Sequence, residues 1–398
     1  MLKRTNVRKK TIKDIPNLSG KRVFLAVDFN ISMENGHVAN DTRIVEALPT
    51  IKYLLSHGAK LIIASHLGRP NGYDPSLTLK PVANRLAQLI GNKVTLIDRY
   101  WEKSVLTKIS KVPEGNVVML ENIRFVKEEE LNERNFSKHL ASMADYFVND
   151  AFGTAHRVHS SIVGIAEFLP AYAGLLMDKE IRMLSEALEN PKRPFLLIIG
   201  GAKTPEKISV IERLLDVADN VILGGAIANT FLAAWGFGTG RSMVDYEMIE
   251  MARVVFWKTT RKHSALLLPL DVSISDKDRK LKPKVTDYNK VPHHMVIYDI
   301  GPKTIKNYQE LIKEAKTIIW NGPMGLYEDA RFAKGTDIVL QSIADSKAFS
   351  IIGGGDTLTT IKKENVEKID HISTGGGAML VFLEKGTLPG IEVLLDAK

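Results

Sequence analysis

Five short apolar segments in the second half of the chain are each followed closely by glycine, and this pattern restricts the fold more than any other feature of the sequence. The best developed example is FLLIIGGAKTPEK at residues 195–207. Its apolar run, FLLII, has the length of a buried strand and is too short for a helix. Gly200 and Gly201 then permit a tight turn or a close approach to a ligand. A helix is predicted next, with Thr204 as its N-cap and Pro205 as its first residue.

The order of these elements, a strand, a glycine turn and a helix N-terminus, favours binding of an anion at the turn. Unpaired backbone N–H groups and the positive end of the helix dipole meet at the turn. Lys203 and Lys207 add two ammonium groups beside it. The alternative is an ordinary strand-to-helix turn with solvated lysines.

The same pattern recurs after the apolar runs VIL, IIW, SII and HIS. The glycines that follow the five runs are Gly200 and Gly201, Gly224 and Gly225, Gly322 and Gly325, Gly353, Gly354 and Gly355, and Gly375, Gly376 and Gly377. Five such turns predict a sheet whose backbone repeatedly approaches a ligand at its carboxyl edge. The dinucleotide Gly-x-Gly-x-x-Gly turn, the Walker loop and the protein kinase motifs are absent from the sequence, so a nucleotide site here belongs to none of those classes.

Asp356 is the acidic residue best placed at these turns to contact a metal ion. A hard cation that bridges phosphates needs only one or two carboxylates from the protein. The alternative is that Asp356 caps the helix that follows.

The first half of the chain alternates strand-length apolar runs with amphipathic segments. Strands are predicted at residues 23–27, 61–64, 94–97, 117–120 and 146–148, and helices at 44–55, 81–90, near Trp101 and at 128–143. This alternation predicts a parallel α/β sheet. Glu34, Asn35 and Gly36 predict a turn. A helix at 173–188 is predicted to join the two halves.

Polar and basic residues stand at the carboxyl ends of the predicted strands, where such sheets bind ligands. They are Asp28, Asn30, His66, Arg69, Arg124, His156 and Arg157. Arg43 lies in the first turn of a helix, where a cation opposes the macrodipole, so it has either a local partner or a ligand. Because guanidinium groups bind phosphate and carboxylate in a bidentate way, this half is predicted to bind a small, multiply anionic molecule. Each residue taken alone could instead be solvated or structural.

Length and composition set broader limits. A chain of 398 residues predicts two domains, with three as an alternative. No apolar run approaches a membrane span, no signal peptide is recognisable and there is no cysteine, so a cytoplasmic protein is expected. The net charge of +8 suits nucleic acid or small polyanions equally well.

Nine motifs in order make the sequence similar to the phosphoglycerate kinase family along almost its whole length. They are VDFN at 27–30, SHLGRP at 65–70, LENIRF at 120–125, NDAFGTAHRVHSS at 149–161, GGAK at 200–203 with Lys207, GGAIANTF at 224–231, WNGPMG at 320–325, GGGDT at 353–357 and STGGGA at 373–378. The resemblance implies transfer of the acyl phosphate of 1,3-bisphosphoglycerate to ADP, with Mg²⁺, giving 3-phosphoglycerate and ATP. It implies two doubly wound, Rossmann-like parallel-sheet domains, an active site in the cleft between them, and a monomer rather than an oligomer.

The resemblance also implies site residues and boundaries. The triose-binding residues would be Asp28, Asn30, Arg43, His66, Arg69, Arg124 and Arg157. The nucleotide-binding residues would be Gly201, Lys203, Lys207, Gly224, Gly225, Asn321, Pro323, Glu328, Gly353, Gly354, Gly355, Asp356 and Thr357, with Asp356 also on the metal. The catalytic set would be Arg43, Lys207, Gly354 and Gly377. The domains would be 1–175 for the triose and 191–384 for the nucleotide, with a linking helix at 176–190 and a tail at 385–398 that returns to the first domain.

Three positions depart from the usual family pattern. Ala26 replaces an arginine, Ser32 replaces a proline and Glu206 replaces an aspartate. The first change removes a positive charge near the triose site, and the last lengthens a carboxylate near the nucleotide phosphates.

Two other classes of protein would share some of these features. A sensor could bind a nucleotide and a phosphorylated metabolite without turnover, but the presence of Lys207 and Arg43 favours an enzyme. A nucleic-acid-binding protein would fit the basic composition, but aromatic residues are not interleaved with the basic ones. A nucleic-acid partner and a membrane partner are therefore not expected.

Overall fold

The computed structural model describes residues 8–112, 115–202, 204–259 and 264–397. The chain divides into two units. Unit 1 comprises Met1–Arg182 together with Thr387–Lys398, and unit 2 comprises Met183–Gly386. The division falls within helix α6 (Leu175–Glu189). None of the helices in the described ranges combines the length and apolar character needed to cross a membrane.

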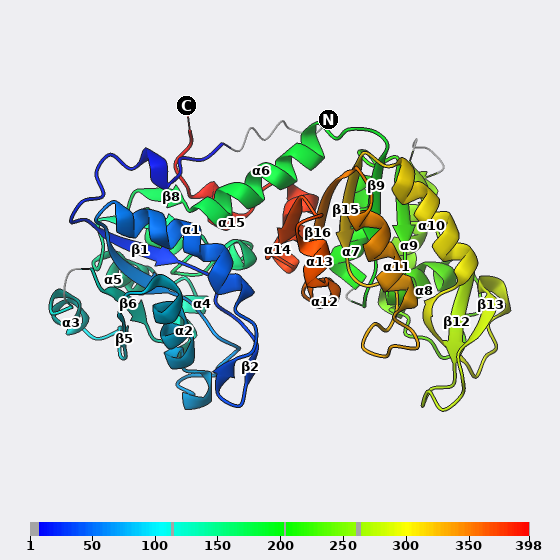
Figure 1. Cartoon of the computed structure of the whole chain (residues 1–398), viewed down its shortest axis with the longest axis horizontal. Coiled ribbons are helices and arrows are strands. Elements are labelled where there is room, and N and C mark those ends of the chain that lie inside the picture. Colours follow the sequence, from blue (N-terminus) through cyan, green and yellow to red (C-terminus); the bar gives the residue numbers. More distant parts are fainter. Residues whose placement is uncertain (1–7, 113–114, 203, 260–263, 398) are drawn as a thin grey trace. The chain divides into compact units, whose positions relative to one another are not determined.

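Unit 1 is built on a parallel sheet with the strand order β5-β6-β4-β1-β7-β8 (Figure 1). The strands are β1 (Arg22–Ala26), β4 (Lys60–Ala64), β5 (Val94–Ile97), β6 (Val117–Leu120), β7 (Tyr146–Asn149) and β8 (Ala171–Ala173). The helices of this unit, besides the first half of α6, are α1 (Thr42–Ser56), α2 (Lys80–Ile90), α3 (Val105–Ser110), α4 (Lys127–Glu130), α5 (Arg134–Ala141) and α15 (Pro389–Glu392). Short 3-10 helices are η1 (Ile12–Asp14), η2 (Pro75–Leu77), η3 (Ile123–Phe125), η4 (Phe152–Thr154) and η5 (Gly164–Glu167). The predicted turn at 34–36 joins the hairpin strands β2 (Met33–Glu34) and β3 (His37–Val38).

Both faces of this sheet are covered, as expected for a parallel sheet. Val23 and Leu25 of β1 pack in one cluster with Ile44 and Ile51 of α1. Phe24 points to the opposite face and is also fully buried. Its ring lies 6.3 Å from that of Phe147. The alternation within β1 therefore separates two apolar layers, both shielded from water.

Unit 2 has a parallel sheet with the order β11-β10-β9-β15-β16-β17. These strands are β9 (Phe195–Ile199), β10 (Asn220–Leu223), β11 (Ala265–Leu267), β15 (Thr317–Asn321), β16 (Phe349–Gly353) and β17 (His371–Ser373). Numbered along the chain, the order is 3-2-1-4-5-6, that of the Rossmann fold. The helices are the second half of α6, α7 (Thr204–Leu214), α8 (Gly225–Ala234), α9 (Ile249–Thr259), α10 (Pro302–Glu314), α11 (Lys334–Ala344), α12 (Gly355–Thr360), α13 (Lys363–Val366) and α14 (Gly377–Lys385), with 3-10 turns η6 (Tyr246–Met248) and η7 (Tyr288–Lys290).

A small antiparallel sheet adds to unit 2. Its order is β13-β12-β14, formed by β12 (Asp271–Ser275), β13 (Lys284–Asp287) and β14 (Val296–Ile300). Figure 1 shows β12 and β13 together beyond the end of α10. The predicted class of two parallel α/β sheets is confirmed, but this third sheet was not predicted from the sequence.

Three predicted helices need correction. The helix expected at 128–143 is broken into α4 and α5, because Asn132 is left-handed at φ +51° and the Glu133 side chain caps α5 by accepting the Phe136 N–H at 2.7 Å. The helix expected from residue 173 begins at Leu175, since Ala173 belongs to β8. The helix expected near Trp101 is α3, which begins only at Val105.

The end of the chain lies against the beginning of the described chain within unit 1. The backbone N–H of Lys10 donates to the Leu395 carbonyl at 2.7 Å, and the N–H of Leu395 donates to the Ala171 carbonyl at 3.0 Å. Gly390 N–H donates to the Ala155 carbonyl at 2.8 Å. Residues 387–398 thus complete unit 1, although all of unit 2 precedes them in the sequence.

Candidate active site

In unit 1 the chain reverses its direction of winding at β1, which has β4 on one side and β7 on the other. Ligands in open α/β sheets bind at such a point, outside the carboxyl ends of the strands. Asp28 follows β1 here, and the loop of residues 149–161 follows β7. The basic residues predicted from the sequence therefore lie where the topology leaves a crevice.

Arg43 has a local partner, which explains how a cation is tolerated in the first turn of α1. Its Nη1 donates to Asp28 Oδ2 at 2.6 Å and to the Asn30 carbonyl at 3.2 Å. The Asn30 side chain in turn accepts the Gly68 N–H at 2.8 Å. Three of the predicted residues thus form one connected group.

The histidines around this group are held neutral. His66 is 7% exposed. The pKa of His66 is lowered to about 3, mainly by burial; Asp28 opposes this shift, and Arg124, Arg157 and Arg43 contribute to it. Burial is also the main cause that lowers the pKa of His156, and that of His159 to about 4. The positive charge of the site therefore comes from its guanidinium groups.

Arg124 is buried with part of its hydrogen-bonding capacity unused. Burial, followed by repulsion from Arg157, lowers the pKa of its guanidinium. Its Nη1 donates to the Gly68 carbonyl at 2.9 Å, and Nε lies 3.3 Å from Glu130 Oε1. Its Nη2 has no hydrogen-bond partner among the described residues. A buried donor of this kind beside a second arginine suits an anionic acceptor.

Arg69 is the one predicted triose residue that the structure does not tie to this cluster. It is exposed next to Gly68, and within the described ranges no hydrogen bond or ion pair holds its side chain. The other six, Asp28, Asn30, Arg43, His66, Arg124 and Arg157, are linked by the contacts and electrostatic interactions given above. We call these six the basic cluster.

Glu129 is a buried acid near the basic cluster that sequence reasoning missed. Its carboxylate accepts the Ser161 hydroxyl at 2.6 Å and the Ser161 N–H at 2.9 Å. Burial raises the pKa of Glu129 to about 7, although the two hydrogen bonds from Ser161 act in the opposite direction. The sequence does not distinguish Glu129 from its neighbours, because the run Glu128-Glu129-Glu130 is typical of a solvent-exposed segment.

Glutamine at position 129 is expected to stabilise the protein above pH 7. The carboxyl pKa rises from its usual 4.5 to about 7 on folding. Between these two pH values the folded chain binds a proton on Glu129 that the unfolded chain does not. The stability that this proton contributes is fully present below pH 4.5 and is lost as the pH rises through about 7. The pKa difference corresponds to a loss of about 3 kcal/mol in the free energy of unfolding at alkaline pH, and Glu129→Gln would recover this loss.

Denaturant unfolding of the variant and the unchanged chain between about pH 5 and pH 8 measures this difference. Glu128→Gln, at the exposed neighbouring position, is the matched control and should show no such trend. A stability difference for Glu129→Gln that stays constant across this range would mean that the carboxyl has an ordinary pKa.

Unit 2 has its own switch point between β9 and β15, the first and fourth parallel strands in chain order. Gly200 and Gly201 follow β9, while Asn321 ends β15 and Gly322 follows it. The turns are joined by backbone hydrogen bonds, from Gly200 N–H to the Asn321 carbonyl at 2.9 Å and from Gly201 N–H to the Pro323 carbonyl at 2.7 Å. The central glycine turns are thus a single interlocked group.

The glycines of unit 2 fall into two groups according to what surrounds them. A Cβ on Gly200 would lie 2.1 Å from the Pro323 carbonyl oxygen, and one on Gly225 would lie 2.6 Å from the Gly201 nitrogen. These glycines are required because the turns pack on one another. By contrast, a Cβ on Gly355 or Gly377 would meet no atom within 4 Å. Gly355 and Gly377 thus have open space around their Cα atoms, whereas Gly200 and Gly225 are enclosed by neighbouring turns.

Lys207 lies within the interlocked turns. The residue is 6% exposed, and its ammonium donates to the Gly200 carbonyl. A Cβ on Gly201 would lie 2.7 Å from its Nζ and one on Gly322 would lie 2.6 Å from it. The α7 helix therefore directs this cation back to the carboxyl edge of the sheet. Lys203, the other predicted lysine, lies outside the described residues.

Asn321 supplies an unused donor at the same place. It is 2% exposed, and its Nδ2 has no hydrogen-bond partner among the described residues. A Cβ on Gly354 would lie 3.2 Å from this nitrogen. Thr357 is fully buried, and its hydroxyl oxygen accepts the Gly322 N–H at 2.8 Å. Thr357 therefore fixes the turn, while Asn321 has a hydrogen to donate.

A cavity of about 470 Å³ opens beside these turns. Gly201, Gly225, Pro323, Glu328 and Asp356 are the predicted residues among its lining. Its walls also include Asn229, Met243, Val272, Ile297, Tyr298 and Leu326, which sequence reasoning missed. Several of these come from the unpredicted antiparallel sheet. Gly353 is not part of the lining, because it packs against Met379.

Asp356 is the predicted metal ligand, and its surroundings show what a metal ion there would need. Among the described residues, no group of three or more His, Asp or Glu side chains is arranged to hold a metal. Asp356 is exposed in the first turn of α12 and borders the cavity. A single carboxylate there fits a magnesium ion that takes its other ligands from phosphates and water.

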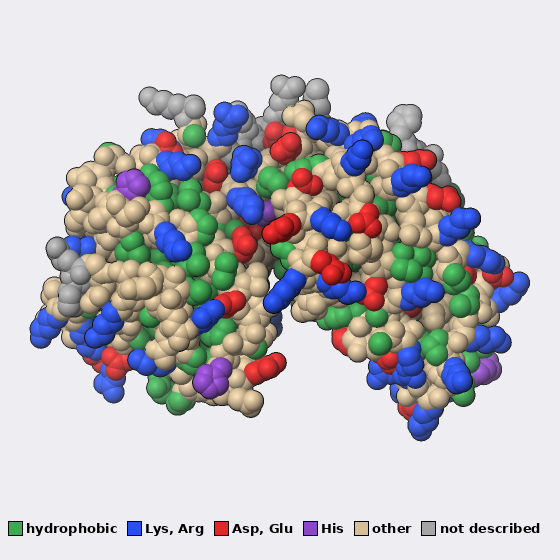
Figure 2. All heavy atoms as spheres, viewed as in Figure 1, with side chains coloured by type: hydrophobic (Ala, Val, Ile, Leu, Met, Phe, Trp, Pro, Cys, Tyr) green, Lys and Arg blue, Asp and Glu red, His purple; other side chains and the backbone are tan. Residues whose placement is uncertain are grey.

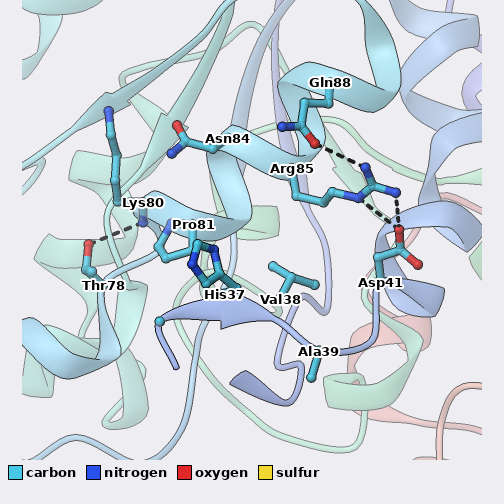
Figure 3. A pocket seen from close by; sticks show the side chains of 11 residues that line it. His37, Val38, Ala39, Asp41, Thr78, Lys80, Pro81, Asn84, Arg85 and Gln88 are labelled. Atoms are coloured by element: carbon cyan, nitrogen blue, oxygen red, sulfur yellow. Dashed lines mark hydrogen bonds and ion pairs between the residues drawn. The ribbon is translucent and has the colours of Figure 1, made fainter. Parts of the chain in front are cut away.

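A further groove in unit 1, of about 730 Å³, lies between the β2–β3 hairpin and α2 (Figure 3). Arg85 Nε and Nη2 both donate to Asp41 Oδ2, at 2.9 and 2.7 Å. The Asp41 carbonyl accepts two N–H groups from the first turn of α1, those of Ile44 and Val45. The charge of Arg85 is therefore balanced within the groove, where it fixes the start of the helix that carries Arg43.

Charge on the face shown in Figure 2 is mixed. On the face shown in Figure 2, Lys and Arg side chains are interspersed with Asp and Glu over both units. A nucleic-acid-binding protein would gather its basic residues in one patch or stripe. The visible face does not carry such a patch.

Two parallel α/β units, one with a guanidinium cluster and the other with glycine turns around a buried lysine at the carboxyl edge, define a two-domain α/β kinase. The phosphoglycerate kinase family model matches residues 12–386, so the chain belongs to the phosphoglycerate kinase family. Its activity is the reaction of 1,3-bisphosphoglycerate with ADP to give 3-phosphoglycerate and ATP.

Relatives and solved structures agree with this assignment. The chain is 48% identical to the phosphoglycerate kinase of Dictyoglomus turgidum, over 98% of this chain and 99% of the relative. It is 45% identical to that of Pelotomaculum thermopropionicum, over 98% and 99%. The phosphoglycerate kinase structures of Coxiella burnetii and Pyrococcus horikoshii superpose with TM-scores of 0.85 and 0.86, at 39% and 36% identity, each covering 97% of this chain and 98% of the other.

Proposed function

We propose that the triose substrate binds at the basic cluster of unit 1, with Arg69 as an additional contact. The observation that carries this proposal is the buried Arg124, whose Nη2 lacks a partner among the described residues while Arg157 and Arg43 lie near enough to shift the pKa of His66. Guanidinium groups hold phosphate and carboxylate in bidentate geometry. The neutral imidazole of His66 can donate a hydrogen bond without adding charge.

The nucleotide would bind at the carboxyl edge of unit 2. The residues we assign to it are Gly201, Lys203, Lys207, Gly224, Gly225, Asn321, Pro323, Glu328, Gly353, Gly354, Gly355, Asp356 and Thr357, of which Lys203 rests on the family resemblance alone. The cavity of about 470 Å³ would take the nucleoside. The unused Nδ2 of Asn321 and the open backbone at Gly355 support phosphate binding beside it. Gly353 and Thr357 would act by shaping the turns.

Mg²⁺ would be held by Asp356 together with the nucleotide phosphates. When bound, it offsets phosphate charge, which lowers the repulsion between the nucleotide and the second anionic substrate. The exposed carboxylate at the cavity edge supports this assignment.

The chain's own residues would carry the transfer by position and charge. The nucleophile is already an oxygen of ADP or of a carboxylate, so no general base is required. Lys207 would neutralise the phosphoryl group from unit 2, and Arg43 would stabilise it from unit 1. Backbone N–H groups at Gly354 and Gly377 would donate further hydrogen bonds. Asp28 would hold the Arg43 guanidinium through their ion pair of 2.6 Å.

Binding of both substrates together is expected to compact the protein. The assigned residues for the two substrates lie in different units, whereas in-line transfer needs reacting atoms about 3–3.5 Å apart. Closure about α6 would bring them together and exclude water from the acyl phosphate.

Small-angle scattering of the free protein, of each singly bound form and of the doubly bound form tests this proposal. The radius of gyration should fall clearly only when 3-phosphoglycerate and the magnesium nucleotide are both present. The same data give the molecular mass, and we propose that the protein is a monomer. We also propose that the enzyme is cytoplasmic. Equal radii in all four states would contradict closure and the division of the site between the units.

A further inference from the structure

Glu129 is buried in a helix whose other acidic residues are exposed. It is 1% exposed, whereas Glu128 and Glu130 on either side are exposed. Burial of a carboxylate is unfavourable unless hydrogen bonds compensate it. Burial of Glu129 therefore indicates that its carboxylate has hydrogen-bond partners in the folded chain.

What Glu129 holds is the end of the loop at residues 149–161. Both carboxylate oxygens accept hydrogen bonds from Ser161, one from the hydroxyl and one from the backbone. The backbone adds two more contacts, from Ser160 N–H to the Glu129 carbonyl at 2.9 Å and from the Ser160 hydroxyl to the Glu128 carbonyl at 3.0 Å. Four hydrogen bonds thus fasten the loop to α4.

The two segments joined in this way each carry a guanidinium group of the basic cluster. Arg157 lies in the loop, four residues before Ser161, and Arg124 lies in η3, shortly before α4. Arg124 is itself bound to the Gly68 carbonyl at 2.9 Å. The hydrogen bonds of Glu129 therefore fix the loop arginine relative to an arginine that is already anchored.

Glu129 is close to the basic cluster without forming part of it. A cavity of about 10 Å³, the size of one water molecule, is lined by Ala26, His66, Arg124, Glu129, His159 and Ser161. The nearest basic group is His159, with Nδ1 3.9 Å from Oε1, and burial keeps that imidazole neutral by lowering its pKa to about 4. The hydrogen bonds that the carboxylate accepts come from Ser161, while Arg124 acts on it electrostatically.

We propose that Glu129 is a positioning residue for the triose site, which acts through Ser161 to set the place of Arg157 opposite Arg124. The proposal rests on the assignment of the triose to the basic cluster. Glutamine can keep both contacts, because its carbonyl accepts the Ser161 N–H and its amide donates to the Ser161 hydroxyl oxygen. Leucine, of similar size, can keep neither.

Steady-state kinetics of the full chain in the direction of ATP consumption test the proposal. Glu129→Leu should raise the KM for 3-phosphoglycerate roughly tenfold while the KM for ATP stays within about twofold. Glu129→Gln should return the KM for 3-phosphoglycerate to within about twofold of the unchanged chain. Ser161→Ala, which removes one hydrogen bond, should raise it roughly threefold, and Glu128→Leu at the exposed neighbour should have no effect.

The outcomes separate this inference from the proposed triose site. Arg157→Ala measured alongside should raise the KM for 3-phosphoglycerate, and an unchanged value would overturn the triose assignment itself. If Arg157→Ala has its effect while Glu129→Leu does not, only the positioning role is overturned. An equal rise in the KM for ATP, or a Glu129→Gln variant as impaired as Glu129→Leu, would also overturn it. If Glu129→Leu does not fold, Ser161→Ala becomes the deciding variant. An unchanged KM for 3-phosphoglycerate in Ser161→Ala would then overturn the positioning role.

Discussion

Replacement of Lys207 by alanine is expected to lower turnover by on the order of 100-fold to 1,000-fold, with ADP affinity changed only a few-fold. The side chain is buried, and its ammonium lies between the turns at Gly201 and Gly322. Charge that develops on the transferred phosphoryl group would be met by this cation in a site with little water. Lys207 is not among the residues that line the neighbouring cavity, which we propose for the nucleoside.

Coupled assays measure the turnover, and calorimetric titration of ADP measures the affinity. Arg213→Ala is the matched control, since it removes a cation from the last turn of the same helix, α7. Lys207→Met, which keeps the apolar part of the side chain, separates loss of charge from loss of packing. Turnover near that of the unchanged chain in both Lys207 variants would remove this residue from the transfer step.

Replacement of Arg43 by alanine is expected to lower turnover by on the order of 100-fold or more, with a much smaller change in 3-phosphoglycerate affinity. Arg43 lies in the first turn of α1, where the helix dipole disfavours a cation, and Asp28 compensates it through an ion pair of 2.6 Å. Because the ion pair fixes the guanidinium in place, Arg43 interacts most favourably when negative charge develops beside it in the transition state. Ground-state binding, by contrast, is shared with Arg124 and Arg157 in the proposed site.

Arg134→Ala is a suitable control for the loss of one arginine from unit 1. Its side chain is exposed on α5 and pairs with Glu167 at 3.3 Å. Turnover of this variant should match that of the unchanged chain. If Arg43→Ala instead raises only the KM for 3-phosphoglycerate, Arg43 is a binding residue and not a catalytic one.

The elements that the sequence predicts well are those determined by neighbours along the chain. The strand and turn from Phe195 to Gly201 and the helix that carries Lys207 lie as predicted, because run length, glycine and helical spacing are local signals. The helix itself begins at Thr204, one residue earlier than predicted. The antiparallel sheet was missed because β12 and β14 acquire their pairing only in three dimensions. That sheet forms much of the cavity wall.

The candidate site was predicted as a set of residues, but its internal contacts were not. Nothing in the spacing of Asp28 and Arg43 reveals a bond between their side chains, since the bond depends on where α1 packs on the sheet. Sequence also cannot distinguish a glycine approached by a ligand from one approached by another turn. Gly225 packs against the turn at Gly201, whereas Gly355 faces open space.

The path of the chain through the two units has a consequence for the order in which they are made. Unit 2 is one continuous stretch, whereas unit 1 needs residues 387–398, which follow all of unit 2 in the sequence. As the chain emerges from the ribosome, unit 2 can therefore fold while unit 1 still lacks its last segment. That segment includes Gly390, which hydrogen-bonds to Ala155 and to the Asn149 side chain in the loop that carries Arg157. The proposed triose site thus becomes complete only after all of unit 2 has been made.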